Sequence, residues 1–314
     1  MVRLKDDKEI KDIVKQEINV FFVSNSTCYY FVDELYGLLS AAGYDQVTLA
    51  LAYYGGCSIK QHYEWIKDSS SNYEFRVIDK NGLHIRSNYS LNDALNEKNW
   101  HIISFDNNAA TFASGDAHTA IEITEPHFGL LLAYIKDKFP QAHYLWHEVW
   151  ANEIGYKSAF HMTTKEQRTR VYKAKQGLMN YMTNTYGMEG VPTGDAWEKV
   201  RDLPLFTVPH PAFPEVERFS LCSRLHREAF KDDFSHDGDI GGGQYLNACV
   251  WFEVLTGESC IDNTFRPQYK YNGRDVSLTE EKILVLQNAA HDAMVEYRHL
   301  FCQHLNLPSH PQNA

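Results

Sequence analysis

The chain has 314 residues, 44% of them hydrophobic, and a formal net charge of −11. This length fits one large α/β domain or two small ones. Because the sequence contains no basic run, nucleic acid is excluded as an expected partner, and no apolar run approaches the length of a membrane span. The charged N-terminal segment has no apolar core of a signal peptide, and the 6 scattered cysteines form no Cys-x-x-Cys zinc or redox motif. We therefore expect a cytoplasmic protein with reduced thiols.

Strands and helices alternate along the chain, beginning with an apolar run at residues 18–23. Its β-branched and aromatic side chains are typical of a buried strand. The polar residues 24–27 end this strand and are preferred N-caps for a helix at residues 29–42. Further strands are predicted at residues 46–54, 100–105, 142–149 and near 190. Further helices are predicted at residues 58–65, 91–97, 126–139, 164–186, 245–255 and 278–300.

The remaining segments are predicted to connect these elements. Residues 73–89 alternate around Asn81-Gly82, which predicts a β-hairpin, and we interpret it as an insertion rather than a pair of core strands. Residues 111–122 are small and polar and are predicted to form a loop. The segment at residues 203–218 contains several prolines, so it is predicted to be an irregular surface loop, and residues 261–274 are predicted to be a connector.

This alternation predicts a three-layer α/β/α fold, a doubly wound, flavodoxin-like sheet of about five parallel strands with helices on both faces. Residues 1–276 are expected to form a single domain, with residues 277–314 as a C-terminal helix and tail packed on it. In such sheets the functional site lies at the carboxyl ends of the strands. Four polar clusters are predicted to meet there, at residues 24–27, 55–58, 106–108 and 147–148.

A fifth polar segment carries the most specific pattern in the chain, because it places Asp233 three residues before His236 on a polar loop. A glycine run and an apolar helix follow. A carboxylate held against one imidazole nitrogen leaves the other nitrogen free to act as a base, which is half of a nucleophile-activating triad. The alternative is a surface loop with unrelated charges, since other aspartates crowd the same segment.

Ser26 is the candidate nucleophile, because a strand, a polar turn and a helix would present its hydroxyl at the edge of the sheet. The alternative is that the residues around Ser26 only cap the helix. Cys28 is a rival nucleophile, which we expect to lie in the first helical turn and to face away from the site.

The candidate oxyanion donors are the backbone N–H of Gly56, the side-chain amide of Asn107 or Asn108, and the backbone N–H of Ser26. Such donors stabilise the negative charge that develops in acyl transfer. The alternative is that these glycines and asparagines only form turns.

His147, Glu148 and Trp150 follow the fourth predicted strand and are candidate substrate-contacting residues. The pair His147-Glu148 begins like a zinc-protease His-Glu-x-x-His motif, but no second histidine follows, so a zinc protease is disfavoured. The triple glycine at residues 241–243 lacks the lysine and the serine or threonine of a phosphate-binding loop.

Together these segments resemble the SGNH (GDSL-like) hydrolase superfamily, and most closely a bacterial branch long labelled as a domain of unknown function. The resemblance covers about residues 20–257. It matches Ser24-Asn25-Ser26 to the first block, Gly56 to the second, Asn107 and Asn108 to the third, and Asp233 with His236 to the last. Two departures are that Ser24 replaces the glycine of the first block and that the third block is degenerate.

The resemblance implies a serine esterase that hydrolyses small acyl esters, often acetyl groups on a carbohydrate, through an acyl-enzyme and without a metal or an organic cofactor. It implies a carbohydrate ester or a small molecule as the partner, and it leaves a homo-oligomer open. A non-catalytic carbohydrate-binding protein on the same fold is the alternative. A phosphoester hydrolase is a third interpretation, for which the sequence shows no metal cluster.

Overall fold

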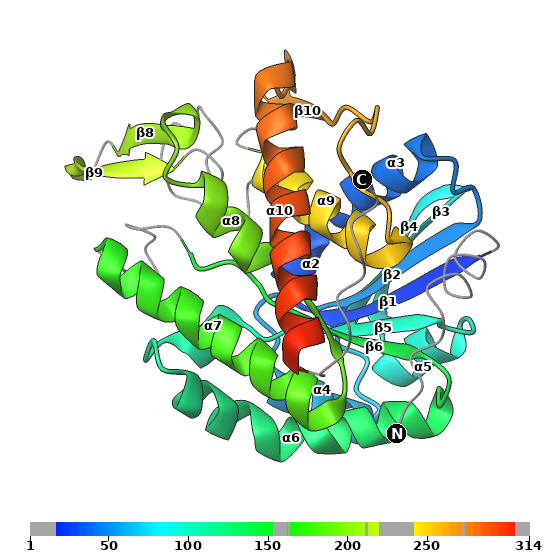
Figure 1. Cartoon of the computed structure of the whole chain (residues 1–314). Helices are drawn as coiled ribbons and strands as arrows, with labels where there is room; N and C mark the ends of the chain where they lie inside the picture. Colours follow the sequence, from blue (N-terminus) through cyan, green and yellow to red (C-terminus); the bar gives the residue numbers. More distant parts are fainter. Residues whose placement is uncertain are drawn as a thin grey trace.

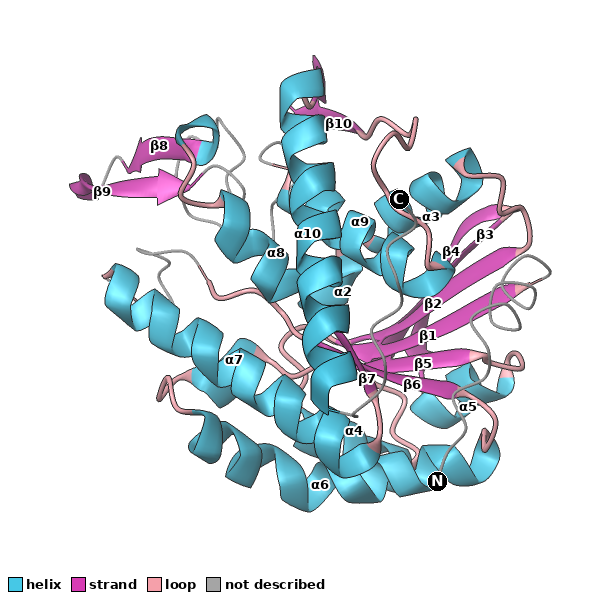
Figure 2. Cartoon of the chain, viewed as in Figure 1, coloured by secondary structure: helices cyan, strands magenta, loops and turns pink. Residues whose placement is uncertain are grey.

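The computed structural model describes residues 17–152, 162, 164–210, 213–219, 242–271 and 274–304, with the backbone alone for residues 207–210, 213–219, 269–271, 274–276 and 301–304. Its strands are β1 (Ile18–Ser24), β2 (Val47–Tyr53), β3 (Tyr73–Asp79), β4 (Gly82–Tyr89), β5 (Ile102–Phe105), β6 (His143–His147), β7 (Glu189–Val191), β8 (Thr207–His210), β9 (Phe213–Phe219), β10 (Gln268–Tyr271) and β11 (Arg274–Ser277). Figures 1 and 2 show these elements as one layered body.

The helices are α2 (Ser26–Tyr29), α3 (Val32–Ala41), α4 (Ile59–Asp68), α5 (Leu91–Asn96), α6 (Ala117–Lys138), α7 (Lys165–Tyr186), α8 (Thr193–Val200), α9 (Gly243–Thr256) and α10 (Glu280–His304). The described part of the chain also contains the short 3-10 turns η1 (Ala109–Phe112) and η2 (Pro204–Phe206). Among the described residues, none of these helices combines the length and the apolar character needed to cross a bilayer.

The central sheet has the strand order β4-β3-β2-β1-β5-β6-β7. The strands from β2 through β1, β5 and β6 to β7 pair in parallel. Counted among the parallel strands alone, this order is 2-1-3-4-5, the flavodoxin-like order of a doubly wound sheet. The predicted fold class is confirmed. The strand order reverses between β1 and β5, and the carboxyl ends of these two strands therefore flank the crevice where such folds bind ligands.

Strand β1 lies at the centre of the molecule because its sequence is apolar on both faces. All its residues are buried, and alternate side chains enter two different cores: Val20 and Phe22 face one layer of helices, and Phe21 and Val23 face the other. Side chains alternate across a strand, so an uninterrupted apolar run is the pattern expected of a strand covered on both sides.

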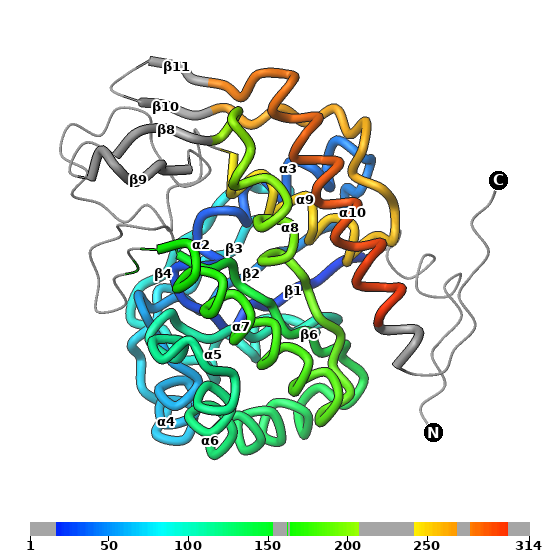
Figure 3. Tube along the Cα trace, turned by 60° about the vertical axis from the view of Figure 1, so that its left-hand side comes forward, coloured from blue at the N-terminus to red at the C-terminus, as the bar shows by residue number. Residues whose placement is uncertain are grey.

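The two helical layers are clearly separated. Helices α3, α8, α9 and α10 pack together on one face of the sheet, whereas α4, α5, α6 and α7 cover the other. Figure 3 shows α4, α5 and α6 at the lower left, below the strands, and α10 running down the right side of the molecule. Helix α9 is buried around nearly its whole circumference, because it is sandwiched between the sheet and three other helices.

Several predicted segments differ from the structure. The hairpin at residues 73–89 is present, but its strands β3 and β4 extend the central sheet, because β3 pairs antiparallel with β2. The predicted loop at residues 111–122 is wrong: η1 begins at Ala109 and α6 at Ala117, since the Asp116 side chain caps the helix by accepting from Thr119 N.

The two later connecting segments also contain strands. The predicted proline-rich loop includes the antiparallel pair β8 and β9, and the predicted connector includes β10 and the start of β11. Prolines are compatible with such short two-stranded edges, where not every backbone N–H must donate to a neighbour.

Candidate active site

The turn at Ser24–Cys28, here called the nucleophile turn, connects β1 to the short helix α2. Asn25 is the N-cap of α2, and its side-chain oxygen accepts a hydrogen bond from Thr27 N at 3.2 Å. Ser26 is the first residue of the helix and is half-buried, while the four other residues of the turn are buried. The turn therefore leaves Ser26 as its one residue with partial access to solvent.

Asp106, directly after β5, holds the nucleophile turn in place. Its Oδ2 accepts a hydrogen bond from Ser24 Oγ at 2.6 Å and another from the Thr27 hydroxyl. Its Oδ1 accepts from Asn25 Nδ2 at 3.1 Å. The side chain is about 1% exposed. A buried carboxylate with several donors fixes the positions of those donors, so Asp106 determines the conformation of the residues on both sides of Ser26.

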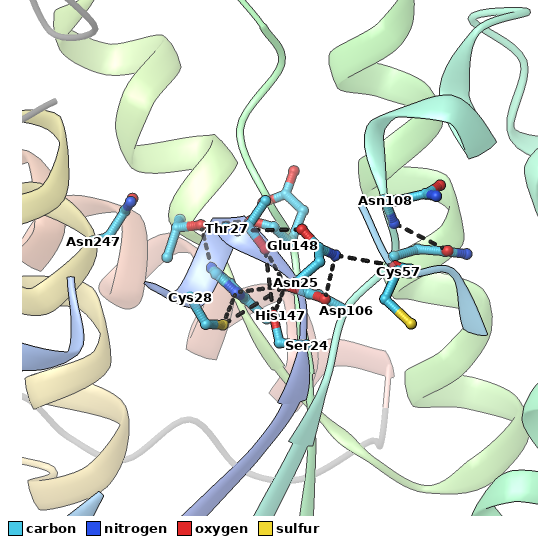
Figure 4. Close-up of polar contacts among 12 residues, drawn as sticks. Ser24, Asn25, Thr27, Cys28, Cys57, Asp106, Asn108, His147, Glu148 and Asn247 are labelled. Carbon is cyan, nitrogen blue, oxygen red and sulfur yellow. Dashed lines mark hydrogen bonds and ion pairs between the residues drawn. The ribbon is translucent and has the colours of Figure 1, made fainter. Parts of the chain in front are cut away.

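Cys28 and His147 complete this buried cluster (Figure 4). Cys28 Sγ lies 3.6 Å from Asp106 Oδ2 and 3.5 Å from His147 Nδ1. His147 Nδ1 lies 3.7 Å from Asp106 Oδ2. Cys28 was expected to face away from the site. Its side chain is buried in the interior, where it contacts Asp106.

The tautomer of His147 follows from its second contact. The Thr193 hydroxyl donates to the Glu148 carbonyl oxygen at 2.6 Å, so its oxygen accepts from His147 Nε2–H at 2.9 Å. His147 Nδ1 then carries a lone pair toward Cys28 and Asp106. Burial lowers the pKa of His147, which favours this neutral form.

Cys28 is not a nucleophile in this arrangement. Burial, together with the nearby Asp106 charge, raises the pKa of its thiol well above the usual value. The thiolate is the reactive form of cysteine, so a buried neutral thiol is inert. In addition, Cys28 and Asp106 both contact Nδ1 of His147. In a catalytic triad, one imidazole nitrogen contacts the nucleophile and the other contacts the carboxylate.

The candidate oxyanion residues come together from two strand ends. Gly56 adopts a positive φ of 71° at an exposed turn, and its carbonyl oxygen accepts from Asn108 Nδ2 at 2.7 Å. The next carbonyl, that of Cys57, lies 3.5 Å from Asn25 Nδ2. The second and third blocks therefore lie against the nucleophile turn, as the resemblance implies. The use of these groups as oxyanion donors stays a prediction.

The two asparagines differ in their surroundings. Asn107 is buried and donates its amide N–H to Thr124 Oγ1 at 2.7 Å. Asn108 is half-buried, and its side-chain oxygen caps η1 through Thr111 N at 3.3 Å. An amide NH₂ group has two hydrogens, so Asn108 keeps a second donor beside the exposed Gly56 turn.

The three candidate substrate-contacting residues lie in the interior. His147 and Glu148 are each 1% exposed, and Trp150 is stacked on Trp197 with ring centroids 4.7 Å apart. Glu148 Oε2 accepts from Asp195 N at 3.2 Å, and burial raises the pKa of this carboxyl. Contact of these residues with a substrate stays a prediction that this packing does not support. Asp233 and His236 lie outside the described residues.

The comparisons with known proteins locate the chain in a family. The domain of unknown function DUF4886 matches residues 19–203, which is more than half of the chain. The chain belongs to the DUF4886 family. This agrees with the predicted resemblance to a bacterial branch of the SGNH-like proteins that carries such a label. No curated protein matches the sequence.

Solved structures support the fold of this DUF4886 chain. A DUF4886 family protein from Bacteroides uniformis is 22% identical, with a TM-score of 0.67 over 89% of this chain and 95% of that one. A candidate GDSL-like lipase from Parabacteroides merdae matches with 13% identity and a TM-score of 0.46 over 77% of this chain and 97% of that one. An acetyl xylan esterase matches with 13% identity and a TM-score of 0.37 over 55% and 76%. The last two likenesses are too distant to inform function.

A second buried histidine near this edge of the sheet makes the stability of the protein depend on pH. His62 of α4 is fully buried, and its Nδ1 contacts the Tyr73 hydroxyl at 2.8 Å. Burial lowers its pKa to about 4. An unfolded histidine titrates near pH ~6.5, so the unfolded chain binds a proton that the folded chain does not bind between these two values. The stabilisation is therefore complete above pH ~6.5 and is lost as the pH falls toward 4.

We expect His62 alone to lower the free energy of unfolding by about 2 kcal/mol between pH 7 and pH 5. Urea unfolding at a series of pH values measures this slope. His62→Gln should make the free energy of unfolding depend less on pH. The control His118→Gln changes a histidine whose side chain is 80% exposed and should leave this dependence unchanged. Equal slopes for the His62→Gln variant and the wild type would contradict the assignment.

The sequence indicated which polar strand ends lie together, but it missed the roles of three residues in the buried cluster. Asp106 was recognised only as part of a polar strand end, and Cys28 and Thr193 received no role in the cluster. The available signal was the polar residue directly after each parallel strand, since these ends converge at one edge. The pairing of Asp106 with Ser24 spans 82 positions, a separation that no local pattern encodes.

Proposed function

We propose that this chain is a serine esterase that hydrolyses small acyl esters, with an acetyl group on a carbohydrate as the preferred substrate class. The observation that carries the proposal is the position of Ser26. It is the half-buried first residue of a helix at the carboxyl end of β1, beside the point where the strand order reverses. A hydroxyl at this place lies in the crevice where doubly wound folds bind substrates.

In the proposed reaction, His236, oriented by Asp233, removes the proton from Ser26 Oγ as that oxygen attacks the ester carbonyl carbon. The N–H groups of Ser26 and Gly56, with the amide of Asn108 or Asn107, hold the oxyanion. The ester C–O bond then breaks, and His236 gives its proton to the leaving alcohol oxygen. Water, deprotonated by the same histidine, attacks the acyl carbon. The bond between that carbon and Ser26 Oγ then breaks, His236 returns the proton to Ser26 Oγ, and the acid leaves.

The contacts of the residues that flank Ser26 support its proposed role as the nucleophile. Ser24, Asn25 and Thr27 all direct their side chains to Asp106, and these contacts hold the turn rigid on both sides of Ser26. A nucleophile held on a rigid turn loses little freedom when it reacts, which is the part of catalysis that positioning supplies.

Covalent labelling tests the proposal directly. A fluorophosphonate reacts with an activated serine: the serine oxygen bonds to phosphorus and fluoride leaves. We expect the wild type to hydrolyse p-nitrophenyl acetate, to lose this turnover on labelling, and to carry the phosphonyl group on the peptide that contains Ser26. A label on another residue, or turnover that survives complete labelling of Ser26, would contradict the proposal.

A second function, carbohydrate binding without catalysis, is favoured by one observation. The buried Asp106 carboxylate lies under the nucleophile turn, and a negative charge there opposes a developing oxyanion. This alternative predicts saturable binding of acetylated xylo-oligosaccharides in calorimetry, with neither ester turnover nor fluorophosphonate labelling.

A further inference from the structure

The strongest unassigned feature of the molecule is the cluster of Cys28, Asp106 and His147 beneath the nucleophile turn. The three residues come from α2, from the end of β5 and from the end of β6, and all three are buried. Their ligand atoms, Cys28 Sγ, one Asp106 carboxylate oxygen and a His147 ring nitrogen, all lie within 4.8 Å of one another. Thiolate, carboxylate and imidazole are the ligand types of zinc in proteins.

The cluster has too few protons for its contacts. His147 Nε2–H is used by Thr193, so Nδ1 presents a lone pair, and Asp106 Oδ2 already accepts from two hydroxyl groups. Cys28 has a single S–H, which can donate either to Nδ1 or to Oδ2 but not to both. The 3.7 Å contact between Nδ1 and Oδ2 then joins two acceptors with no proton between them. A cation placed among three such atoms removes this conflict.

The distances fit a tetrahedral ion. With ligand bonds of about 2.3 Å to sulfur and about 2.0 Å to nitrogen and oxygen, the ligand atoms of a zinc tetrahedron lie about 3.3–3.6 Å from one another. The three edges of the cluster measure 3.5, 3.6 and 3.7 Å. The cluster therefore needs shifts of only a few tenths of an ångström to hold such an ion.

The surroundings also resemble those of a metal site. His147 donates its remote N–H to Thr193, which is tied to the Glu148 carbonyl, and Asp106 is oriented by Ser24, Thr27 and Asn25. Such outer hydrogen bonds orient metal ligands and fix the histidine tautomer. Among the described residues, no lysine or arginine nitrogen lies within 4.0 Å of the Asp106 carboxylate, so the buried charge has no direct cationic partner other than His147. Hydrogen bonds and the more distant Lys175 offset part of the cost of this buried charge, and a bound cation would offset more of it.

We propose that Cys28, Asp106 and His147 bind one zinc-class divalent cation, which pins the nucleophile turn to the ends of β5 and β6. One thiolate and one carboxylate neutralise its two positive charges. The Cys28 proton is released to solvent when the ion binds, since a ligating thiol is deprotonated. The fourth position falls to a water or to the Thr27 hydroxyl, which already contacts the same carboxylate. The role is structural, and it is independent of whether Ser26 is catalytic.

Cobalt substitution tests the proposal, because Co²⁺ takes zinc sites and a thiolate bound to it gives a charge-transfer absorption band. The full chain is expressed in medium supplemented with Co²⁺ and purified without chelators. We expect about one metal ion per chain by elemental analysis and a thiolate-to-cobalt band. Because the site is buried, loading during synthesis or refolding is part of the design.

Two cysteine variants identify the ligand. Cys28→Ser should remove the band, whereas Cys57→Ser, which changes a second buried cysteine at the same edge of the sheet, should retain it. A wild type without bound metal or without the band overturns the proposal even if no variant folds. Retention of the band in a folded Cys28→Ser protein, or its loss in a folded Cys57→Ser protein, overturns it as well.

Discussion

Ser26→Ala is expected to lower kcat for p-nitrophenyl acetate by at least about 10³-fold, because the variant has no oxygen that can form the acyl-enzyme. The change removes one hydroxyl from a half-buried residue, so the free energy of unfolding should stay within about 1 kcal/mol of the wild type. Steady-state kinetics and urea unfolding on the same preparations measure the two effects. His236→Ala should lower kcat by a similar factor, since the loss of either residue disables the pair.

A matched serine variant separates catalysis from stability. Ser90 follows β4 and caps α5 through Asp93 N. In the sheet, β4 is separated from β1 by β3 and β2. Ser90→Ala should lower the free energy of unfolding by about 1 kcal/mol and leave kcat unchanged. If the Ser26→Ala protein turns over the ester at the wild-type rate, Ser26 is not the nucleophile, whatever the behaviour of the control.

Trp251→Ala is expected to lower the free energy of unfolding by about 3–5 kcal/mol, which is the usual cost of emptying a large aromatic site in a core. Trp251 of α9 is fully buried. Its ring centroid lies 5.0 Å from that of Phe22 and 6.0 Å from that of Phe31. It also lies 5.5 Å from the His147 ring, so the cavity would open beside the buried cluster. Urea unfolding measures the loss, provided that the slope of the unfolding free energy against urea concentration is the same in the variant and the wild type.

Trp251→Phe is the matched control for shape. Its ring refills most of the cavity, and it removes an indole N–H that has no hydrogen-bond partner in the described part of the chain. Removing an unpaired buried donor costs little, so this variant should lose clearly less stability than Trp251→Ala. Equal losses for the two variants, or a loss below about 1 kcal/mol for Trp251→Ala, would show that α9 does not anchor the core as described.

The elements that the sequence predicted well are those with strong local patterns. The apolar run at residues 20–23 of β1 and the largely apolar helix α9 are patterns typical of elements buried at the centre of a layered fold. The start of α6 was missed because its first residues are small and polar, and Pro126, which usually begins a helix, lies inside it. The capping contact at Asp116 outweighs the weak propensity of those residues.

The polar site could be predicted only as a set of strand ends. Which ends meet depends on strand order, and how deeply a side chain is buried depends on the packing of helices that are distant in sequence. Asp106 therefore has the same local pattern as an exposed turn residue, although it is buried beneath the nucleophile turn. Cys28 was placed correctly in the first helical turn, but its contacts with Asp106 and His147 arise from three separate segments.

The central position of β1 has a consequence for how the protein assembles. Its two neighbours in the sheet are β2 and β5, and the second of these is separated from it by the whole β3–β4 hairpin and its flanking helices. Pairing between such distant segments is slow, because the entropy cost of closing the loop between them comes before the stabilising contacts form. The nucleophile turn therefore cannot reach Asp106 until the chain has been synthesised beyond β5, and shorter nascent chains carry an unfinished site. We expect the proposed esterase activity to recover in refolding only after this late contact has formed, and not with the early formation of local helices.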